Sequence, residues 1–404
     1  MKNLIHSLLP QWAINNFYHL PKAILANILY GFPFRKLKVI GVTGTDGKTT
    51  TVNMIYQILK QTGKKVSMIS TINGVIAGKS YDTGFHVTSP DPLTVQKLAQ
   101  EALNNGDEYL VLEVTSHALD QYRFWGIKFE VGVITNVTHE HLDYHGNFEN
   151  YLKTKFRLTG DAKFAVLNQG IGGVRASKVV TFGLENGDFN QKEIKLKLQI
   201  PGEYNIENAL AALAVAYVLG IDKEQALRSL RNFKGLIGRM EEVKNNRGIR
   251  IIIDFAHTPN GLEQALKALR TSRGPKDQQA SPGRLIAVFG AASQRDILKR
   301  PMMGKISAKL ADITILTDED PRFESRNKII EEIAAGAYSK GAKDMENLYK
   351  EPDRKKAIRL AISLSRAGDI IGIFGKGHER SMNYQGIERP WSDREAVEEA
   401  LSDG

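Results

Sequence analysis

The stretch VIGVTGTDGKTTTVNMIYQIL (Val39–Leu59) decides the fold of the first half of this sequence. An apolar run typical of a buried strand leads into the glycine-bracketed Lys48–Thr50, and a helical pattern follows to about Gln61. Glycines let backbone N–H groups converge on an anion, and a helix N-terminus adds partial positive charge. We therefore predict a strand, a phosphate-binding loop and a helix in direct succession.

The predicted ATP-binding loop consists of Gly44, Thr45, Asp46, Gly47, Lys48, Thr49 and Thr50. Lys48 is expected to contact the β- and γ-phosphates, and the Thr49 hydroxyl to bind Mg²⁺. Val42 stands where the strict motif has its first glycine, so the loop is a variant, G-x-x-G-K-T-T. A glycine-rich turn without a ligand is the alternative, but Lys-Thr-Thr directly opening a helix favours a nucleotide.

Composition restricts the class of protein. A chain of 404 residues, 42% hydrophobic and 25% charged, predicts a globular protein of two or three domains. The sequence has no cysteine, which excludes disulfides and thiolate metal sites. It shows neither a secretory signal nor an apolar run long enough to span a membrane, so we expect a cytoplasmic protein without stable membrane insertion.

A net charge of +10 is compatible with nucleic-acid binding or with an enzyme whose ligands are polyanions. Lysines and arginines are interleaved with acids along the whole chain, and no basic stripe with aromatic residues is present. The second interpretation is favoured, with small-molecule substrates and no nucleic acid.

Strand and helix patterns alternate from Leu37 onward, which predicts an α/β fold with a mostly parallel sheet and helices on both faces. We expect a central P-loop ATPase domain and a C-terminal Rossmann-like α/β domain. The expected domains are a short helical segment at 1–36, an ATP-binding domain at 37–237 and a second α/β domain at 238–404. The predicted strands are LKVIGVTG, KKVSMIS, EYLVLEVTS, VGVITNVT, RGIRIIIDFAH, RLIAVFGAA, ADITILT and DIIGIFG, and the main helices LTVQKLAQEALNNG and PGEYNIENALAALAVAYVLGI.

Acidic and histidine side chains gather between the strand that ends at Glu113 and the segment THEHLDYHG. A zinc-protease motif is excluded, because H-E-x-x-H requires a second histidine where Asp143 stands. Glu113, at the carboxyl end of a strand, is expected to hold Mg²⁺ near the phosphates, with His141 as a further ligand. Lys155 follows on a helix, and a lysine beside a metal is unusual unless its charge has been changed.

Nine motifs occur in one order over residues 39–380, and together they resemble the Mur ligase family. They are GVTGTDGKTTT, EVTSHAL, NVTHEHLDYHG with YLKTK, YNIENALAA, GRMEEV, DFAHTPNGLEQAL, VFGAASQRDILKRPMMG, DEDPR and GKGHE. The resemblance implies an ATP-driven amide-bond ligase that adds the third residue of the peptidoglycan stem peptide to a UDP-N-acetylmuramoyl-dipeptide. The substrate carboxylate would become an acyl phosphate, which the incoming amine attacks.

The resemblance also implies roles for individual residues. It implies two Mg²⁺ ions held by Thr49, Glu113, His141 and a carbamylated Lys155 (N6-carboxylysine), with Lys48, Lys155, His141 and Glu113 catalytic. Asn205 and Asn208 would face adenine, Asp254 the ribose, and Arg239 the nucleotide from the second domain. Thr88, Ser89, Thr115 and Arg123 would hold the muramoyl-peptide, and Asp320, Arg322, Gly375 and Glu379 the incoming amino acid.

The choice of acceptor depends on DEDPR and GKGHE. Relatives that use meso-diaminopimelate carry D-N-P-R, where this chain has Glu319–Arg322. A guanidinium clamps a carboxylate with two hydrogen bonds, and diaminopimelate has a second carboxylate that lysine lacks. Arg322 therefore favours diaminopimelate, with Glu379 receiving the far ammonium; L-lysine is the alternative. Only about 43 residues precede the loop, too few for a uridine-binding domain, so UDP is bound differently or the substrate lacks it.

Three other functions compete with this interpretation. The first is another ligase of the same superfamily, such as a folylpolyglutamate synthase or a cyanophycin-type ligase, which DEDPR followed by GKGHE disfavours. The second is a non-catalytic ATP-binding partner subunit, which would be expected to lose residues such as Lys48, Glu113 or Lys155. The third is a nucleic-acid ATPase. We expect a monomer.

Overall fold

The computed structural model describes residues 9–81, 89–138, 140–160, 162–173, 176, 178–272, 283–293 and 296–403. Thr88 and most of the polar loop predicted from Thr271 to Arg284 lie outside these ranges. The chain forms two compact units. The first comprises Met1–Val137, His145–Gln199 and Tyr204–Phe233, and the second Thr138–Tyr144, Ile200–Glu203 and Lys234–Gly404.

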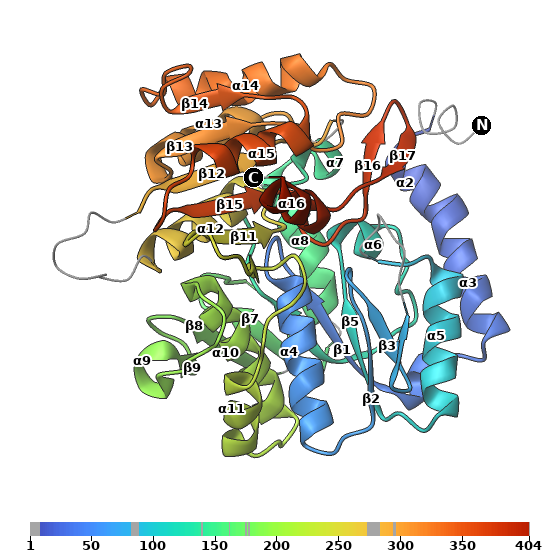
Figure 1. The fold of residues 1–404 in the computed structure, drawn as a ribbon. Coiled ribbons are helices and arrows are strands. Elements are labelled where there is room, and N and C mark those ends of the chain that lie inside the picture. The colour runs from blue at the N-terminus through green and yellow to red at the C-terminus, as the bar shows by residue number, and fades with distance from the viewer. Residues whose placement is uncertain are drawn as a thin grey trace. The chain divides into compact units, whose positions relative to one another are not determined.

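A nine-stranded sheet forms the centre of the first unit (Figure 1). Its order is β4-β3-β2-β5-β1-β6-β7-β8-β9, with every pair parallel except those of the β2-β3-β4 meander. The strands are β1 (Lys38–Thr43), β2 (Val66–Ile69), β3 (Gly74–Ile76), β4 (Lys79–Tyr81), β5 (Tyr109–Glu113), β6 (Phe129–Ile134), β7 (Phe164–Asn168), β8 (Val179–Gly183) and β9 (Phe189–Asn190).

Helices cover this sheet. α5 and α8 share a core with β1, β5 and β6, in which Val95, Leu112 and Leu158 are buried, and α4 packs against β1, β2 and β5. The helical segments of the unit are α2 (Gln11–Ile14), η1 (Asn15–His19), α3 (Leu20–Leu29), η2 (Pro33–Lys36), α4 (Lys48–Gln61), α5 (Pro92–Asn104), α6 (Ser116–Asp120), α8 (Phe148–Gly160), α9 (Gln191–Ile194), α10 (Glu203–Val218) and α11 (Lys223–Arg231). α7 (Leu142–His145) links the two units in sequence.

β1 is central in the sheet, between β5 and β6, and helices α4 and α8 pack against it. Five of the six residues of β1 are buried, as expected for a continuous apolar run in a parallel sheet. Parallel register pairs Val42 with Glu113 and Thr43 with Ile134. The carboxyl ends of three adjacent strands therefore meet where the glycine loop leaves β1.

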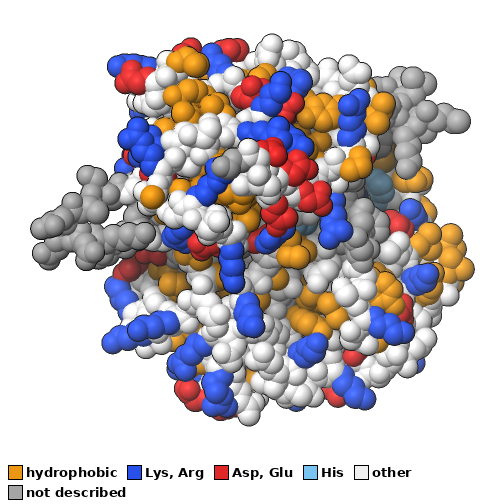
Figure 2. Space-filling view, in the orientation of Figure 1, with side chains coloured by type: hydrophobic (Ala, Val, Ile, Leu, Met, Phe, Trp, Pro, Cys, Tyr) orange, Lys and Arg blue, Asp and Glu red, His pale blue; other side chains and the backbone are white. Residues whose placement is uncertain are grey.

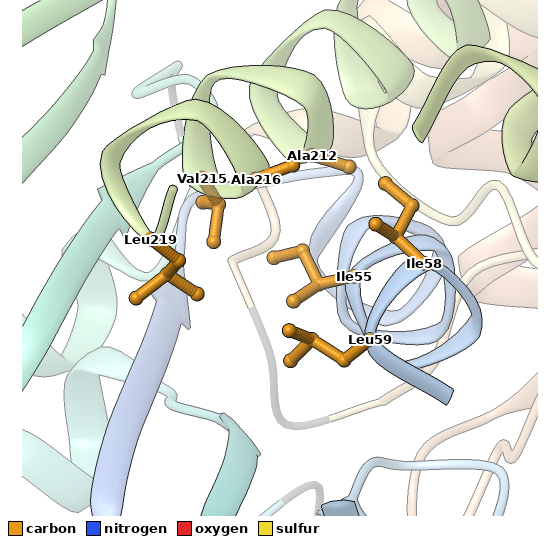
Figure 3. A pocket seen from close by; sticks show the side chains of 7 residues that line it. All are labelled: Ile55, Ile58, Leu59, Ala212, Val215, Ala216 and Leu219. Atoms are coloured by element: carbon orange, nitrogen blue, oxygen red, sulfur yellow. The ribbon is translucent and has the colours of Figure 1, made fainter. Parts of the chain in front are cut away.

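A small apolar pocket lies between α4 and α10 (Figure 3). It is lined by Ile55, Ile58, Leu59, Ala212, Val215, Ala216 and Leu219. All seven side chains are aliphatic, so the pocket offers no hydrogen bond to a nucleotide or a sugar. It is a small gap in the apolar packing between α10 and α4, the helix that follows the glycine loop.

The second unit contains a six-stranded sheet in the order β10-β11-β15-β12-β13-β14, parallel except at β10. Its strands are β10 (Glu241–Val243), β11 (Arg250–Asp254), β12 (Leu285–Phe289), β13 (Ile313–Leu316), β14 (Leu348–Lys350) and β15 (Ile370–Phe374), and β16 (Ser381–Tyr384) and β17 (Ile387–Pro390) form a separate hairpin. The helices are α12 (Pro259–Thr271), α13 (Lys299–Leu310), α14 (Arg326–Tyr338), α15 (Arg354–Leu364) and α16 (Asp393–Ser402).

Helices cover both faces of this second sheet as well. Ile371 and Ile373 share a core with α15 and α16, whereas Gly372, between them, faces Leu269 of α12. Side chains alternate between the two faces of a strand, so α12 lies on the face opposite α15 and α16. This confirms the predicted doubly covered α/β architecture.

The predicted α/β class with mostly parallel sheets is confirmed, and each predicted strand is present. The pattern did not predict β3, β4, β7, β8, β9, β10, β14, β16 or β17. Seven of these are edge or hairpin strands of two to four residues, too short for a periodic pattern to be recognised. β7 and β8, of five residues each, lie inside the sheet and were missed. Within the described residues, no helix combines the length and apolarity needed to cross a membrane.

Candidate active site

The glycine loop joins β1 to α4 in a conformation that requires glycine at two positions. Gly44 has φ 155° and Gly47 has φ 82°. A Cβ at Gly44 would lie 1.8 Å from Thr135 Oγ1, and one at Gly47 would lie 2.2 Å from Asn208 Oδ1. Any larger residue would therefore push the loop away from its supports.

The start of α4 has no capping side chain, as is also the case for α2, α3 and α13. Asp91 caps α5 and Asp222 caps α11 through side-chain oxygens, but α4 follows Gly47 and has no side-chain cap. The first N–H groups of a helix have no partner within the helix. The N-terminus of α4, with the positive end of the helix dipole, is the kind of position at which a phosphate group is bound.

Residues at the end of β6 hold the loop in place. Thr45 N donates to Asn136 O at 3.0 Å, and Asp46 N donates to Asn136 Oδ1 at 2.9 Å. Thr135 Oγ1 donates to Asp46 O at 2.6 Å. The roles of Thr135 and Asn136 were not predicted, although two polar residues directly after a buried strand were a usable signal.

Lys48, Thr49 and Glu113 come together at this edge of the sheet. Lys48 Nζ donates to Gly44 O at 3.0 Å and to Thr45 O at 2.7 Å, which folds its side chain back over the loop. Thr49 Oγ1 lies 3.0 Å from both carboxylate oxygens of Glu113. The backbone N–H of Thr71 also donates to this buried carboxylate, at 2.9 Å.

Lys155 is almost completely buried, with 1% of its surface exposed. Its Nζ lies 4.4 Å from the centre of the Tyr151 ring, and the Tyr151 hydroxyl lies 3.1 Å from Thr45 Oγ1 in the loop. Burial lowers the pKa of Lys155 well below its usual value, the charge of Lys48 lowers it further, and Asp46 acts in the opposite direction. The interaction with Lys48 places Lys155 beside the loop as an amine that is readily neutral.

These donors suit Mg²⁺ only in part. A hydroxyl and a carboxylate supply the oxygen ligands that Mg²⁺ prefers, and this ion usually completes its shell with substrate phosphates and water. Among the described residues, no group of three or more His, Asp or Glu side chains is arranged to hold a metal ion. Thr49 and Glu113 therefore fit an Mg²⁺ that arrives with a nucleotide, and Lys155 could join them only after its charge is reversed.

The remaining predicted residues of the first unit lie in two groups. Asn208, on α10, is 3.3 Å from Thr51 Oγ1 and supports Gly47 from behind, with Asn205 next to it. Ser89 Oγ lies 3.2 Å from Thr115 Oγ1. Arg123 donates to the backbone oxygen of Ser89.

His141 belongs to the second unit, where it has φ 57° and lies 4.0 Å from the carboxylate of Glu140. Glu140 is buried, and its carboxylate is 3.6 Å from Lys299 Nζ, which also donates to His257 O at 2.9 Å. The buried Glu140–Lys299 pair was not predicted. Metal binding by His141 together with Glu113 stays a prediction.

Asp254 is linked to the segment that contains Arg239 by a hydrogen bond from the next residue, Met240. The Asp254 carboxylate accepts hydrogen bonds from the N–H groups of Met240 and Ala256, both at 2.8 Å. The Arg239 guanidinium lies 4.5 Å from the centre of the Phe255 ring. Asp254 therefore orders the segment that presents Arg239.

Lys376 organises the predicted amino-acid pocket. Its fully buried Nζ is 2.9 Å from Asp320 Oδ1 and 2.5 Å from Glu379 Oε2. Burial alone would lower the pKa of Lys376, but Glu379 and Asp320 outweigh it and raise that pKa. DEDPR has Asp320 where D-N-P-R has asparagine, which adds a negative charge to this pocket. The buried ammonium group of Lys376 offsets that charge.

Arg322 has a strained backbone and an uncommitted side chain. Asp320 and Arg322 have φ 44° and 47°, a strained region that non-glycine residues adopt only rarely. Hydrogen bonds to Asn383 and Gln385 hold the backbone of Arg322. Within the described part of the chain its guanidinium makes no hydrogen bond or ion pair. It is therefore available to a ligand carboxylate.

Glu319 lies behind this pocket, against Gly375, where a Cβ would be 2.2 Å from Glu319 Oε2. That oxygen is buried without a hydrogen-bond partner among the described residues. Burial raises the pKa of Glu319 to about 7, against the opposing charges of Lys299, Arg354 and Lys376. The burial of Glu319 was not predicted from the sequence.

Stability should depend on the ionisation of Glu319. Its pKa of about 7 in the folded chain exceeds the ordinary 4.5, so between these values the folded state binds more protons than the unfolded state. Raising the pH through this window therefore lowers the free energy of unfolding. In Glu319→Gln this loss should disappear, so the variant gains up to about 3 kcal/mol relative to wild type from pH 5 to pH 8.

The measurement is the chemical denaturation of both proteins across this pH range. Glu346→Gln serves as the control, because the Glu346 side chain is 64% exposed. Parallel curves for wild type and Glu319→Gln would contradict the expectation.

Gly47→Ala should damage nucleotide binding more than stability. The left-handed φ of 82° costs about 1–2 kcal/mol for a non-glycine residue, and the contact with Asn208 must also shift the loop. Gly63→Ala is a matched control, since Gly63 has φ 78° and open space around its Cβ. We expect ADP affinity to fall at least about tenfold in Gly47→Ala and to be unchanged in Gly63→Ala, by calorimetric titration. Equal ADP affinity in the two variants would contradict the loop assignment.

A parallel α/β sheet, an uncapped helix after a glycine loop, and a threonine–carboxylate pair at the loop define the class of P-loop nucleotide-dependent enzymes. Residues 42–216 match the Mur ligase middle domain, and residues 238–377 match the Mur ligase glutamate ligase domain. The chain belongs to the Mur ligase family. Members of this family depend on ATP and Mg²⁺.

Named relatives agree with this assignment. The chain is 36% identical over 403 residues to the UDP-N-acetylmuramoyl-L-alanyl-D-glutamate--2,6-diaminopimelate ligase of Parabacteroides distasonis, covering 94% of this chain and 81% of the relative. It is 37% identical to ligase 1 of that name from Clostridium acetobutylicum, covering 90% and 77%. A solved structure of a ligase of that name superposes with a TM-score of 0.59 at 26% identity, covering 95% and 82%.

Proposed function

We propose that this chain is an ATP-dependent ligase that joins meso-diaminopimelate to the D-glutamate of UDP-N-acetylmuramoyl-L-alanyl-D-glutamate in peptidoglycan synthesis. The observation that carries the proposal is the meeting of the glycine loop, the Thr49–Glu113 pair and the buried Lys155 in one unit, in a chain 36% identical to a diaminopimelate ligase. The substrate carboxylate attacks the γ-phosphorus, ADP leaves, and the acceptor amine then displaces phosphate from the acyl phosphate.

The residues of the first unit would hold the two reacting anions together. The N–H groups of α4 and the loop bind the phosphates, and Lys48 leaves its carbonyl partners to neutralise the γ-phosphoryl charge. Thr49 and Glu113 would hold Mg²⁺, which supplies further positive charge to the phosphate oxygens. Ser89, Thr115 and Arg123 would position the muramoyl-peptide, a role we extend to Thr88.

Lys155 would act as a carbamate. A neutral amine adds to CO₂ and releases a proton, and the product is a carboxylate on the lysine chain. Burial and the neighbouring Lys48 favour the neutral amine, and a carbamate would instead be attracted by Lys48. With Glu113 and His141 it would provide the additional oxygen and nitrogen ligands for two Mg²⁺ ions.

The second unit would bind the acceptor amino acid. Arg322 would clamp the distal carboxylate of diaminopimelate, and Glu379, held by Lys376, would receive the distal ammonium. Gly375 closes the pocket against Glu319. Arg239 and Asp254 would contact the phosphates and ribose, and Asn205 and Asn208 the adenine. We propose that the protein acts as a cytoplasmic monomer with domains at 1–36, 37–237 and 238–404.

The test is an assay of phosphate release with ATP, the UDP-linked dipeptide and single amino acids, with product masses measured in parallel. We expect release to require all three substrates and to be fastest with meso-diaminopimelate. Turnover of the dipeptide without its nucleotide would identify a substrate that lacks UDP. Release without amino-acid dependence, or with L-lysine alone, would overturn the proposal.

A further inference from the structure

The helical segment at the start of the first unit exposes apolar side chains where a water-facing helix normally carries polar ones. Phe17 is 77% exposed, Trp12 and Leu29 63% each, and Ile28 61%. We call the exposed set Trp12, Phe17, Tyr18, Leu25, Ile28 and Leu29 the N-terminal apolar face. Figure 2 shows orange side chains gathered where α2 and α3 lie in Figure 1.

The exposed apolar residues of α3 lie on one side of that helix, and Trp12 and Phe17 lie before it in the chain with their ring centres 6.4 Å apart. With 3.6 residues per turn, positions 21, 22, 25, 28 and 29 of α3 fall on the same side of that helix and cover about a third of its circumference. Lys22 is the charged residue among them, and it pairs with Asp91 at 3.6 Å. A surface helix whose outward side contacts only water normally carries polar and charged residues on that side.

The other side of the segment is anchored to the unit. Ala23 and Ala26 are fully buried, and the amide of Asn27 donates to Ala23 O at 2.9 Å and to Trp125 O at 3.1 Å. Asn15 Nδ2 donates to Asp120 Oδ2 at 2.7 Å. The helix therefore cannot simply rotate to bury its apolar side, because its inner side already has partners.

The charge of the segment selects among possible occupants. Residues 1–36 contain no Asp or Glu, and their cations are Lys2, Lys22, Arg35 and Lys36. Arg35 and Lys36 are exposed where the segment ends. The segment itself thus combines aromatic and aliphatic side chains on one face with basic and no acidic residues, which are features of helices that lie in the interface of an anionic bilayer. Asp91, outside the segment, is paired with Lys22. A protein interface would more commonly lack lysine and pair charges of both signs.

We propose that the N-terminal apolar face binds the surface of anionic membranes, with α2 and α3 lying in the plane of the interface. Trp12, Phe17 and the aliphatic side chains enter the boundary between head groups and acyl chains, while Arg35 and Lys36 contact lipid phosphates. The association is peripheral, and it does not depend on the reaction that the protein catalyses.

The experiment is co-sedimentation of the full chain with vesicles of phosphatidylglycerol and, separately, of phosphatidylcholine. We expect binding to phosphatidylglycerol that weakens with added salt. The triple variant Leu25→Gln/Ile28→Gln/Leu29→Gln should lower the bound fraction at least about tenfold. The control Met345→Gln/Ile387→Gln, which changes two apolar residues exposed elsewhere, should bind as wild type does.

Two further measurements make the result decisive. The fluorescence of Trp12, isolated by comparison with Trp12→Phe, should shift to the blue on binding, and phosphate release in vesicle-free buffer should be unchanged in the triple variant. The proposal is overturned if neither vesicle binds, if both bind equally, or if the triple variant binds as wild type does. It is also overturned if that variant instead dissociates a homo-oligomer in light scattering, because the face would then join copies of the chain.

Discussion

Lys155→Ala should lower kcat by about a thousandfold while leaving the fold and ADP binding intact. The side chain is buried beside Lys48 and is held as a readily neutral amine. If the amine is carbamylated, its removal deletes a carboxylate from the place where the γ-phosphoryl group transfers. The loss should therefore appear in the chemical step and not in the affinity for ADP.

Chemical rescue separates a carbamate from a structural role. Formate, acetate or propionate should restore part of the activity of Lys155→Ala, because each can place a carboxylate in the vacated space. Wild type should lose activity reversibly in CO₂-depleted buffer and regain it with bicarbonate. Lys153→Ala is the matched control, since Lys153 is on the same helix, is 68% exposed and pairs with Glu149.

Two outcomes would contradict the role of Lys155. One is near-normal kcat in Lys155→Ala. The other is a loss of activity that no short carboxylate restores and that accompanies loss of ADP binding, which would indicate that Lys155 only supports the loop through Tyr151 and Thr45.

Arg322→Ala should raise KM for meso-diaminopimelate by about fiftyfold with little change in kcat, because a charged hydrogen-bonded pair contributes about 1.5–3 kcal/mol. The guanidinium has no partner within the described part of the chain, and its backbone is held in a left-handed conformation. It is therefore preorganised to clamp a carboxylate. L-Lysine lacks that carboxylate, so its weak turnover should not change.

The control for Arg322 is Arg389→Ala, which removes an exposed arginine that lies 5.7 Å from the centre of the Tyr384 ring on the neighbouring hairpin. Its kinetics should match those of wild type. Amino-acid selectivity is measured as the ratio of kcat/KM for diaminopimelate to that for lysine. An unchanged ratio in Arg322→Ala, or a wild type that prefers lysine, would show that Arg322 does not select the acceptor.

Local pattern was sufficient for the parts of this protein whose residues are adjacent in sequence. β1, the glycine loop and α4 are consecutive, so the period of the apolar residues and the positions of Gly44 and Gly47 predicted them together. β1, β2, β5 and β6 were predictable because buried parallel strands are continuous apolar runs, whereas β7, also inside the sheet, was missed. The short edge strands carry too few residues for any period.

The supports of the site depend on contacts between distant segments. Asn136 holds the loop across 90 residues, and Asn208 lies against Gly47 from α10. Lys376 bridges Asp320 and Glu379, whose acidic charge the sequence predicted without its counterion. None of these contacts follows from spacing along the chain, because each depends on which elements pack together.

By itself, the sequence determined the α/β class, the phosphate-binding loop, the family resemblance and the residue types available for chemistry. Tertiary structure alone decided that Lys155 is buried beside Lys48, that Glu319 is enclosed without a hydrogen bond to one of its oxygens, and that the N-terminal helices face outward with apolar side chains. The reason is physical: a motif specifies a backbone shape and a set of functional groups, whereas burial and neighbouring charge set the protonation state and exposure of each group, and both arise only when distant segments pack.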